Sequence, residues 1–151
     1  MKIQEKDFYH GAALTQIVEH NSFTALNKAD NKYGHYIINH DIRLFIKSAK
    51  KTTEDCVWQF TFNRDELNLI QKNFPSNNSA NKLFVCLVCV PNTICVLNED
   101  QLNHIISFSP SKITQWIKVE GPENKSMRVK GSNGPLDKTI PHNAFPNILF
   151  E

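Results

Sequence analysis

Three cysteines with a spacing seen in metal sites lie close together in the middle of the chain: Cys86, Cys89 and Cys95. Thiolates two residues apart are common zinc ligands, and His104 could supply a fourth. The residues between the first two cysteines are leucine and valine, which favour an extended strand. A strand projects Cys86 and Cys89 to opposite faces, whereas a zinc knuckle needs a turn. We therefore expect no bound zinc and reduced cysteines that pack as small core residues.

A second group of residues has the chemistry of a nucleic-acid contact. Trp116, Lys118, Arg128 and Lys130 alternate with apolar residues around a Gly-Pro turn, and residues 112–138 hold six basic residues against three acidic ones. Cations of this kind bind phosphates, and a tryptophan ring stacks on unpaired bases. The solvated face of an antiparallel hairpin gives the same alternation. These four residues are the candidate nucleic-acid-binding residues.

Sequence signatures of other catalysts are missing. The six histidines form no H-E-x-x-H pair, and the chain has no G-x-S-x-G and no glycine-rich phosphate loop. We therefore predict no cofactor. A catalytic cysteine–histidine pair remains an open alternative because its members can be far apart in sequence.

Composition sets the class of protein. The 151 residues are 40% hydrophobic and 21% charged with a formal net charge of +2, and no apolar run approaches the length of a membrane helix. The first residues, MKIQEKDFYHG, contain acids and no apolar signal core. We expect a cytoplasmic protein that makes one α+β domain over residues 1–151, without membrane contact.

The elements that position these residues follow from hydrophobic patterning. The run LFVCLVCV at residues 83–90 predicts a strand buried on both faces, at the centre of a mixed sheet. A three-residue turn at 91–93 would place Cys89 opposite Cys95 on the returning strand. Helices are expected near 7–20, 63–73 and 98–107, with Asp7, Asn63 and Asn98 as their N-caps.

The C-terminal third has a different pattern from the core at 7–107. Residues 112–151 predict an antiparallel hairpin with one wet face, followed by a tail, IPHNAFPNILFE, that packs as an irregular strap. Strand 57–62 alternates large apolar with polar residues and is expected to be half-buried.

The order helix, strand, strand, strand, helix, strand over residues 7–90 resembles the core of the PD-(D/E)XK nuclease superfamily, a restriction-endonuclease-like fold. The resemblance implies a metal held by Asp41 with Glu19 as an auxiliary acid, and Lys47 orienting the attacking water. Strand 57–62 carries neither the acid nor the lysine of the superfamily motif, so a hard cation would be poorly held. A divergent metal-dependent nuclease is therefore the alternative interpretation.

The runs HGAALTQIVEH, YIINHDIRLFIKSA, VWQFTF, LFVCLVC and IPHNAFP together resemble a family of small stand-alone bacterial proteins without an assigned activity. That resemblance implies a bacterial, cytoplasmic, single-domain protein and transfers no catalytic residues.

The main functional hypothesis is a non-catalytic module that binds a macromolecular partner through an exposed strand or hairpin, for example in defence or immunity. It has no predicted catalytic residues, metal or cofactor. A protein is the first expected partner, and nucleic acid is the alternative.

Overall fold

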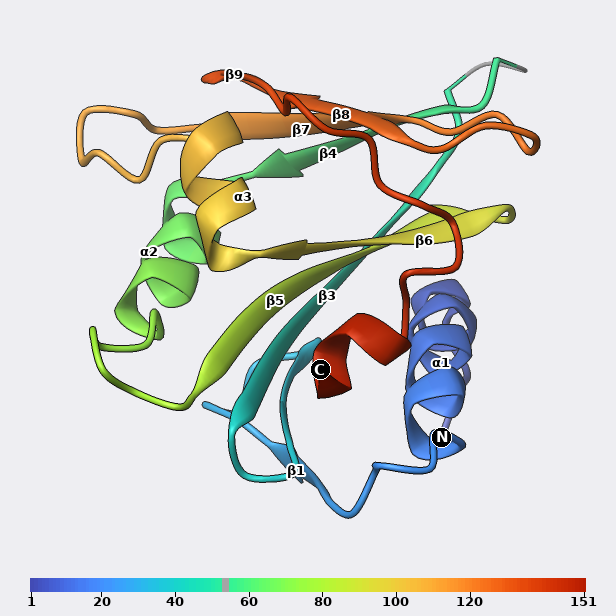
Figure 1. Cartoon of the computed structure of the whole chain (residues 1–151), viewed down its shortest axis with the longest axis vertical. Coiled ribbons are helices and arrows are strands. Elements are labelled where there is room, and N and C mark those ends of the chain that lie inside the picture. Colours follow the sequence, from blue (N-terminus) through green and yellow to red (C-terminus); the bar gives the residue numbers. More distant parts are fainter. Residues whose placement is uncertain (53–54) are drawn as a thin grey trace.

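Figure 1 shows a computed structural model of the chain, which describes residues 1–52 and 55–151. Its elements, in chain order, are α1 (Glu5–Val18), β1 (Leu26–Lys28), β2 (His35–Ile38), β3 (Ile42–Lys50), β4 (Val57–Phe62), α2 (Arg64–Lys72), β5 (Lys82–Val90), β6 (Thr93–Asn98), α3 (Glu99–Ile105), β7 (Gln115–Glu120), β8 (Arg128–Gly131), β9 (Gly134–Pro135) and a final 3-10 helix, η1 (Asn147–Phe150). The fold is the α+β class that the sequence predicts.

Two sheets form the fold. A five-stranded sheet has the order β1-β2-β3-β5-β6 and is mixed, because β3 and β5 run parallel while the other neighbours are antiparallel. A four-stranded antiparallel sheet has the order β4-β7-β8-β9. The C-terminal hairpin of β7 and β8 is thus present as predicted, as part of a larger sheet.

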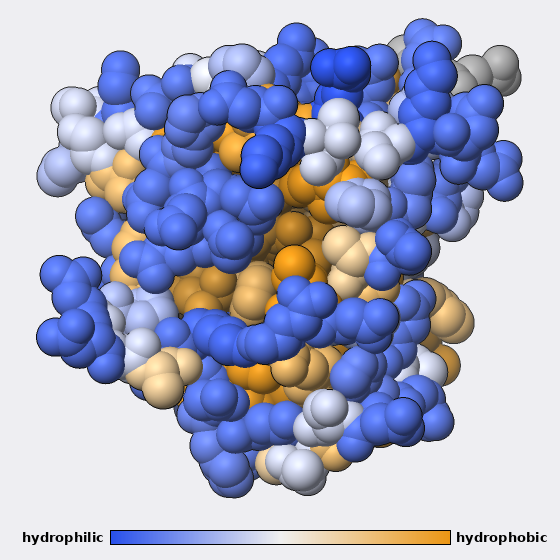
Figure 2. All heavy atoms as spheres, viewed as in Figure 1, coloured by the Kyte–Doolittle hydropathy of each residue, from blue (hydrophilic) through white to orange (hydrophobic). Residues whose placement is uncertain are grey.

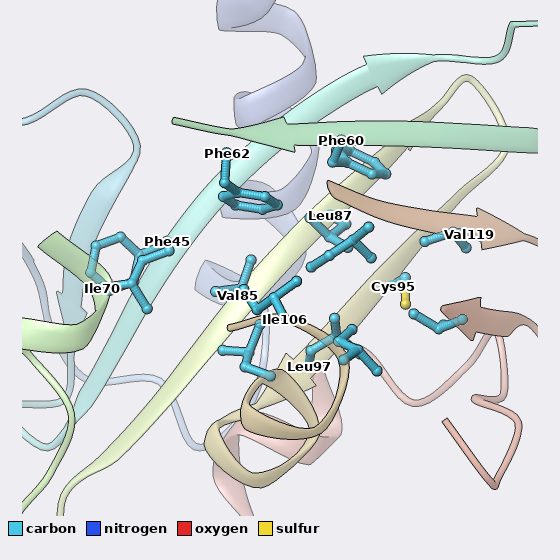
Figure 3. Packing of buried hydrophobic residues seen from close by; sticks show 14 of the residues in the cluster. Phe45, Phe60, Phe62, Ile70, Val85, Leu87, Cys95, Leu97, Ile106 and Val119 are labelled. Carbon is cyan, nitrogen blue, oxygen red and sulfur yellow. The ribbon is translucent and has the colours of Figure 1, made fainter. Parts of the chain in front are cut away.

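The elements stack in layers (Figure 1). Helix α1 and η1 cover one face of the five-stranded sheet, and the four-stranded sheet lies over its other face with α2 and α3 beside it. Two apolar clusters fill the spaces between these layers. Figure 3 shows the larger one, in which Phe60 and Phe62 from β4 approach Val85 and Leu87 from β5.

Strand β5 is buried on both faces, which explains its unbroken apolar run. Cys86 belongs to the cluster beneath α1, whereas Cys89 belongs to the cluster between the sheets. The predicted projection of these two cysteines to opposite faces is confirmed.

Two of the three predicted N-caps are confirmed. The Asn63 side chain accepts the Glu66 amide at 2.8 Å, and the Asn98 side chain accepts the Gln101 amide at 2.9 Å. The prediction for Asp7 is wrong, because α1 begins two residues earlier and its N-cap is Gln4. Asp7 is the third helical residue, and its carboxylate accepts the Gln4 amide at 2.8 Å, so it completes a capping box instead of opening the helix.

The predicted pairing of Cys89 with Cys95 is also wrong. Cys89 lies opposite Thr93, and Cys95 lies opposite Leu87. The cause is a turn that closes one residue earlier than expected, since the Asn92 amide donates to the Cys89 carbonyl at 2.8 Å. Thr93 is therefore the first residue of β6 and not part of the turn.

Strand β4 does not pair with β2 or β3. It pairs with β7 in the four-stranded sheet, with Val57 opposite Glu120 and Phe62 opposite Gln115. The third strand of the order that resembles a nuclease core is therefore outside the mixed sheet. Trp58, Phe60 and Phe62 all point into the space between the sheets, which accounts for the alternation in this strand.

The surface view in Figure 2 is mainly hydrophilic, with a hollow over β6 whose floor is hydrophobic. None of the helices in the described part of the chain has both the length and the apolar character needed to cross a bilayer.

His35 is a titratable residue inside the core, at the start of β2. Its ring is 1% exposed and stacks on Phe45 with the ring centroids 4.0 Å apart. Its Nδ1 atom lies 3.4 Å from the Asp30 carboxylate. Burial lowers the pKa of His35 from 6.5 to about 4, and this outweighs the opposing effect of Asp30.

We expect the free energy of unfolding to fall as the pH is lowered from about 6.5 to about 4, because the unfolded chain takes up a proton at His35 before the folded chain does. The difference between the pKa of His35 in the unfolded chain and in the folded chain limits this loss of stability to about 3 kcal/mol. Urea unfolding at several pH values measures it. In His35→Phe the pH dependence should shrink, and an unchanged slope in this variant would contradict the assignment.

Candidate functional site

The outer face of the four-stranded sheet collects the candidate nucleic-acid-binding residues. Along β7 and β8 the inward side chains are Ile117, Val119 and Val129, which belong to the core cluster. Strand alternation then directs the residues between them outward. We call this surface the basic face, and it contains Trp116, Lys118, Arg128 and Lys130.

The sheet register sets the arrangement of the basic face. Lys118 lies directly opposite Lys130, and Arg128 lies opposite Glu120. Trp116 lies opposite the exposed Thr61 on β4, and the Lys118 Nζ atom is 5.7 Å from the centre of its ring. Like charges on adjacent strands repel each other, so the pair of opposed lysines favours a bound anion.

A shallow pocket of about 410 Å³ lies on the same face, between β7, β8 and the chain that follows β9. Its charged lining residues are Lys118, Glu120, Arg128, Lys130, Asp137 and Lys138. Four cations against two acids give the pocket a formal charge of +2. Sequence patterns did not single out Lys138, because it reaches this surface only through the turn at β9.

The cations of the basic face and the nearby Lys138 differ from those on β3, because no acidic side chain among the described residues pairs with them. Lys118, Arg128, Lys130 and Lys138 form no ion pair within the described residues. On β3, by contrast, Lys47 Nζ lies 2.6 Å from the Glu66 carboxylate, and Lys50 forms an ion pair with Glu5. Arg43 Nη1 lies 3.4 Å from the ring of His35. The cluster on β3 therefore serves contacts inside the fold, while the basic face is left for an external anion.

The structure does not bring together Glu19, Asp41 and Lys47, the residues of the nuclease alternative. Glu19 is the C-cap of α1, on one side of the five-stranded sheet. Lys47 points to the other side, where it contacts Glu66 and lies over the ring of Phe62 at 5.0 Å. Asp41 precedes β3 and is six residues from Lys47, about 20 Å along an extended strand.

The described part of the chain also contains no group of three or more histidine, cysteine or acidic side chains placed to hold a metal ion. All four cysteines are free thiols, and three of them, Cys86, Cys89 and Cys95, are buried. Burial raises the pKa of each of these three thiols. Their thiolate forms, which metal binding and nucleophilic attack require, are therefore disfavoured.

Sequence reasoning missed one polar grouping, the hydrogen bond of 2.8 Å between Thr93 and His142. The two residues are 49 positions apart, and nothing in their local sequence connects them. Only the C-terminal strap, which returns past the tip of the β5–β6 hairpin, brings them together (Figure 1).

No family model matches this chain, and no curated protein or solved structure does so either.

Proposed function

We propose that this protein is a binding module whose basic face binds single-stranded nucleic acid. The observation that carries the proposal is the convergence of a tryptophan and three cations, none of which has an acidic partner among the described residues, on one side of an antiparallel sheet. A bacterial and cytoplasmic setting is part of the same proposal.

The physical basis is the exchange of counterions for protein cations. Each lysine or arginine that contacts a phosphate releases condensed counterions from the strand, which favours binding and makes it sensitive to salt. The cations of the basic face have no acidic partner to give up within the described residues, so binding breaks no ion pair.

Trp116 favours a single strand over a duplex. Its ring lies on the sheet surface beside Lys118, where an unpaired base can stack on it. Bases in a duplex are already stacked on their neighbours and cannot reach a flat sheet. The pocket lined by Lys118 and Lys130, at about 410 Å³, is within the size range of small-ligand sites and is large enough for part of a nucleotide.

The test is fluorescence anisotropy with labelled single-stranded and double-stranded oligonucleotides at several salt concentrations. We expect tighter binding to single strands, and a salt dependence whose slope falls by about 1.4 in the double variant Lys118→Ala/Lys130→Ala. Trp116→Ala should weaken binding by about 1 to 3 kcal/mol with little change in the slope.

The matched control is Lys28→Ala/Lys32→Ala, which removes the same charge from the opposite end of the molecule (Figure 1). It should bind as the wild type does. Equal losses in both double variants would indicate attraction without a site and would overturn the proposal. A stoichiometric protein captured from nuclease-treated lysate, with no oligonucleotide binding, would favour a protein partner instead.

A further inference from the structure

A larger groove of about 850 Å³ lies away from the basic face, and its lining residues come from α1, the tip of the β5–β6 hairpin, the β7–β8 loop and the C-terminal strap. Its polar lining side chains are Tyr9, Gln16, Asn92, Thr93, Glu123 and His142. Ala12, Ile94 and Phe145 are among the apolar ones. The groove therefore combines an apolar wall with a small number of polar groups, as sites for small molecules do.

The hydrogen bonds of His142 fix the position of its proton. Its Nε2 atom lies 2.7 Å from the Lys125 carbonyl oxygen and 3.0 Å from the Pro122 carbonyl oxygen. Carbonyl oxygens only accept, so Nε2 carries the hydrogen. In the neutral imidazole Nδ1 is then an acceptor, and the ring is held in one orientation by the main chain of the β7–β8 loop.

Thr93 supplies the hydrogen that Nδ1 accepts. Its hydroxyl oxygen lies 2.8 Å from Nδ1, which is within the range for a nucleophile bonded to its general base. The base is in turn oriented by other groups, here two carbonyls in place of a carboxylate. If the imidazole becomes protonated, those two carbonyls stabilise its charge.

Two amide side chains also line the groove. Asn92 precedes Thr93 in the hairpin turn, and Gln16 faces the same groove from α1. Neither side chain forms a hydrogen bond with a described residue, so both can donate to a ligand. Asn92 adjoins Thr93 in the chain, and an amide donor at such a position can stabilise the oxyanion that forms when a hydroxyl attacks a carbonyl group.

The lining also indicates the class of ligand. Glu123 is the one acidic side chain among the described lining residues, and no lysine or arginine faces the groove. An anionic substrate would therefore find no countercharge there. A neutral ester with a short apolar acyl chain fits both the apolar wall and the polar centre.

We infer that this groove is a hydrolytic site for neutral carboxylic esters, with Thr93 as nucleophile and His142 as general base. The Thr93 hydroxyl oxygen bonds to the ester carbonyl carbon, and its proton passes to His142 Nδ1. The bond to the alcohol then breaks, and the alcohol leaves with that proton. Water attacks the acyl-threonine, gives a proton to His142 and releases the carboxylic acid, while the proton returns to Thr93.

The test is hydrolysis of p-nitrophenyl acetate and butyrate, combined with mass spectrometry of the intact protein after a short reaction. We expect one acyl group on Thr93 and a kcat/KM at least about 100-fold lower in Thr93→Val, which keeps the shape of the side chain and removes the hydroxyl. Thr93→Ser should retain both the acylation and most of the rate.

The controls separate this site from the basic face and from a purely structural role. Lys118→Ala/Lys130→Ala should hydrolyse the esters as the wild type does, whatever happens to oligonucleotide binding. His142→Gln should lose acylation, and its circular dichroism spectrum reports whether it folds. Equal rates for wild type and Thr93→Val, or an acyl group on another residue, would overturn the proposal. The Thr93–His142 hydrogen bond would then only hold the C-terminal strap against the β5–β6 hairpin.

Discussion

Alanine at position 131 is expected to prevent α3 from docking and to destabilise the fold by about 3 kcal/mol or more. Gly131 is the last residue of β8, opposite Ile117. A Cβ atom there would stand 2.1 Å from the carbonyl oxygen of Ile105 and 2.8 Å from its carbonyl carbon. Both atoms are main chain, so no side-chain rotation relieves the clash.

The consequence extends beyond the contact itself. The Ile105 carbonyl accepts the Asn133 amide at 2.8 Å, so a shift of α3 breaks this bond. It also displaces Leu102 and Ile105, which are fully buried between the sheets. Denaturation monitored by far-ultraviolet circular dichroism measures the loss.

Gly11→Ala is the matched control. Gly11 lies inside α1, and a Cβ atom there would meet nothing within 4 Å. Alanine should stabilise the protein by about 0.5 to 1 kcal/mol, because it lowers the entropy lost when the helix forms. If Gly131→Ala were as stable as wild type, the close approach of α3 to β8 would be contradicted.

Local signals account for the parts of the fold that the sequence predicts well. The apolar run of β5 needs burial on both faces, and the structure provides α1 on one side and the four-stranded sheet on the other. The caps at Asn63 and Asn98 are decided by side chains three residues apart. Such features depend on neighbours in the chain and can be read without the tertiary structure.

Features that depend on distant pairing were missed. Strand β4 alternates in the same way whether it joins β3 or β7, so its sequence cannot indicate that a second sheet begins there. The partner of Cys89 is Thr93, two residues before the expected Cys95, because the turn closes at the hydrogen bond between the Asn92 amide and the Cys89 carbonyl. The alternation of apolar and polar residues in a strand shows which face of the sheet a residue points to, whereas the turn determines which residue it pairs with on the next strand.

The candidate site residues also fall into those that neighbours in the chain determine and those that distant contacts determine. Trp116, Lys118, Arg128 and Lys130 lie within one hairpin, so their shared face follows from strand alternation alone. The positions of Lys138 and of the Thr93–His142 pair depend on the path of the C-terminal strap, and the sequence of the strap has no hydrophobic periodicity that predicts this path. Sequence patterns therefore find a site on one supersecondary unit more readily than a site between units.

Trp58→Ala is expected to destabilise the protein by about 3 to 5 kcal/mol. Trp58 is 0% exposed and belongs to the cluster between the two sheets. Its indole Nε1 atom donates a hydrogen bond of 2.9 Å to the Val90 carbonyl, at the tip of the β5–β6 hairpin. The side chain therefore fills the core and also ties the four-stranded sheet to the five-stranded one.

Trp58→Phe separates these two contributions. Phenylalanine keeps an aromatic ring in the core but removes the donor to Val90, so we expect a smaller loss of about 1 to 3 kcal/mol. Trp116→Phe, on the basic face, should change stability by no more than about 0.5 kcal/mol. Urea unfolding followed by far-ultraviolet circular dichroism compares all three variants without relying on tryptophan emission. If Trp58→Phe and Trp116→Phe lost the same stability, the Val90 hydrogen bond would not hold the two sheets together.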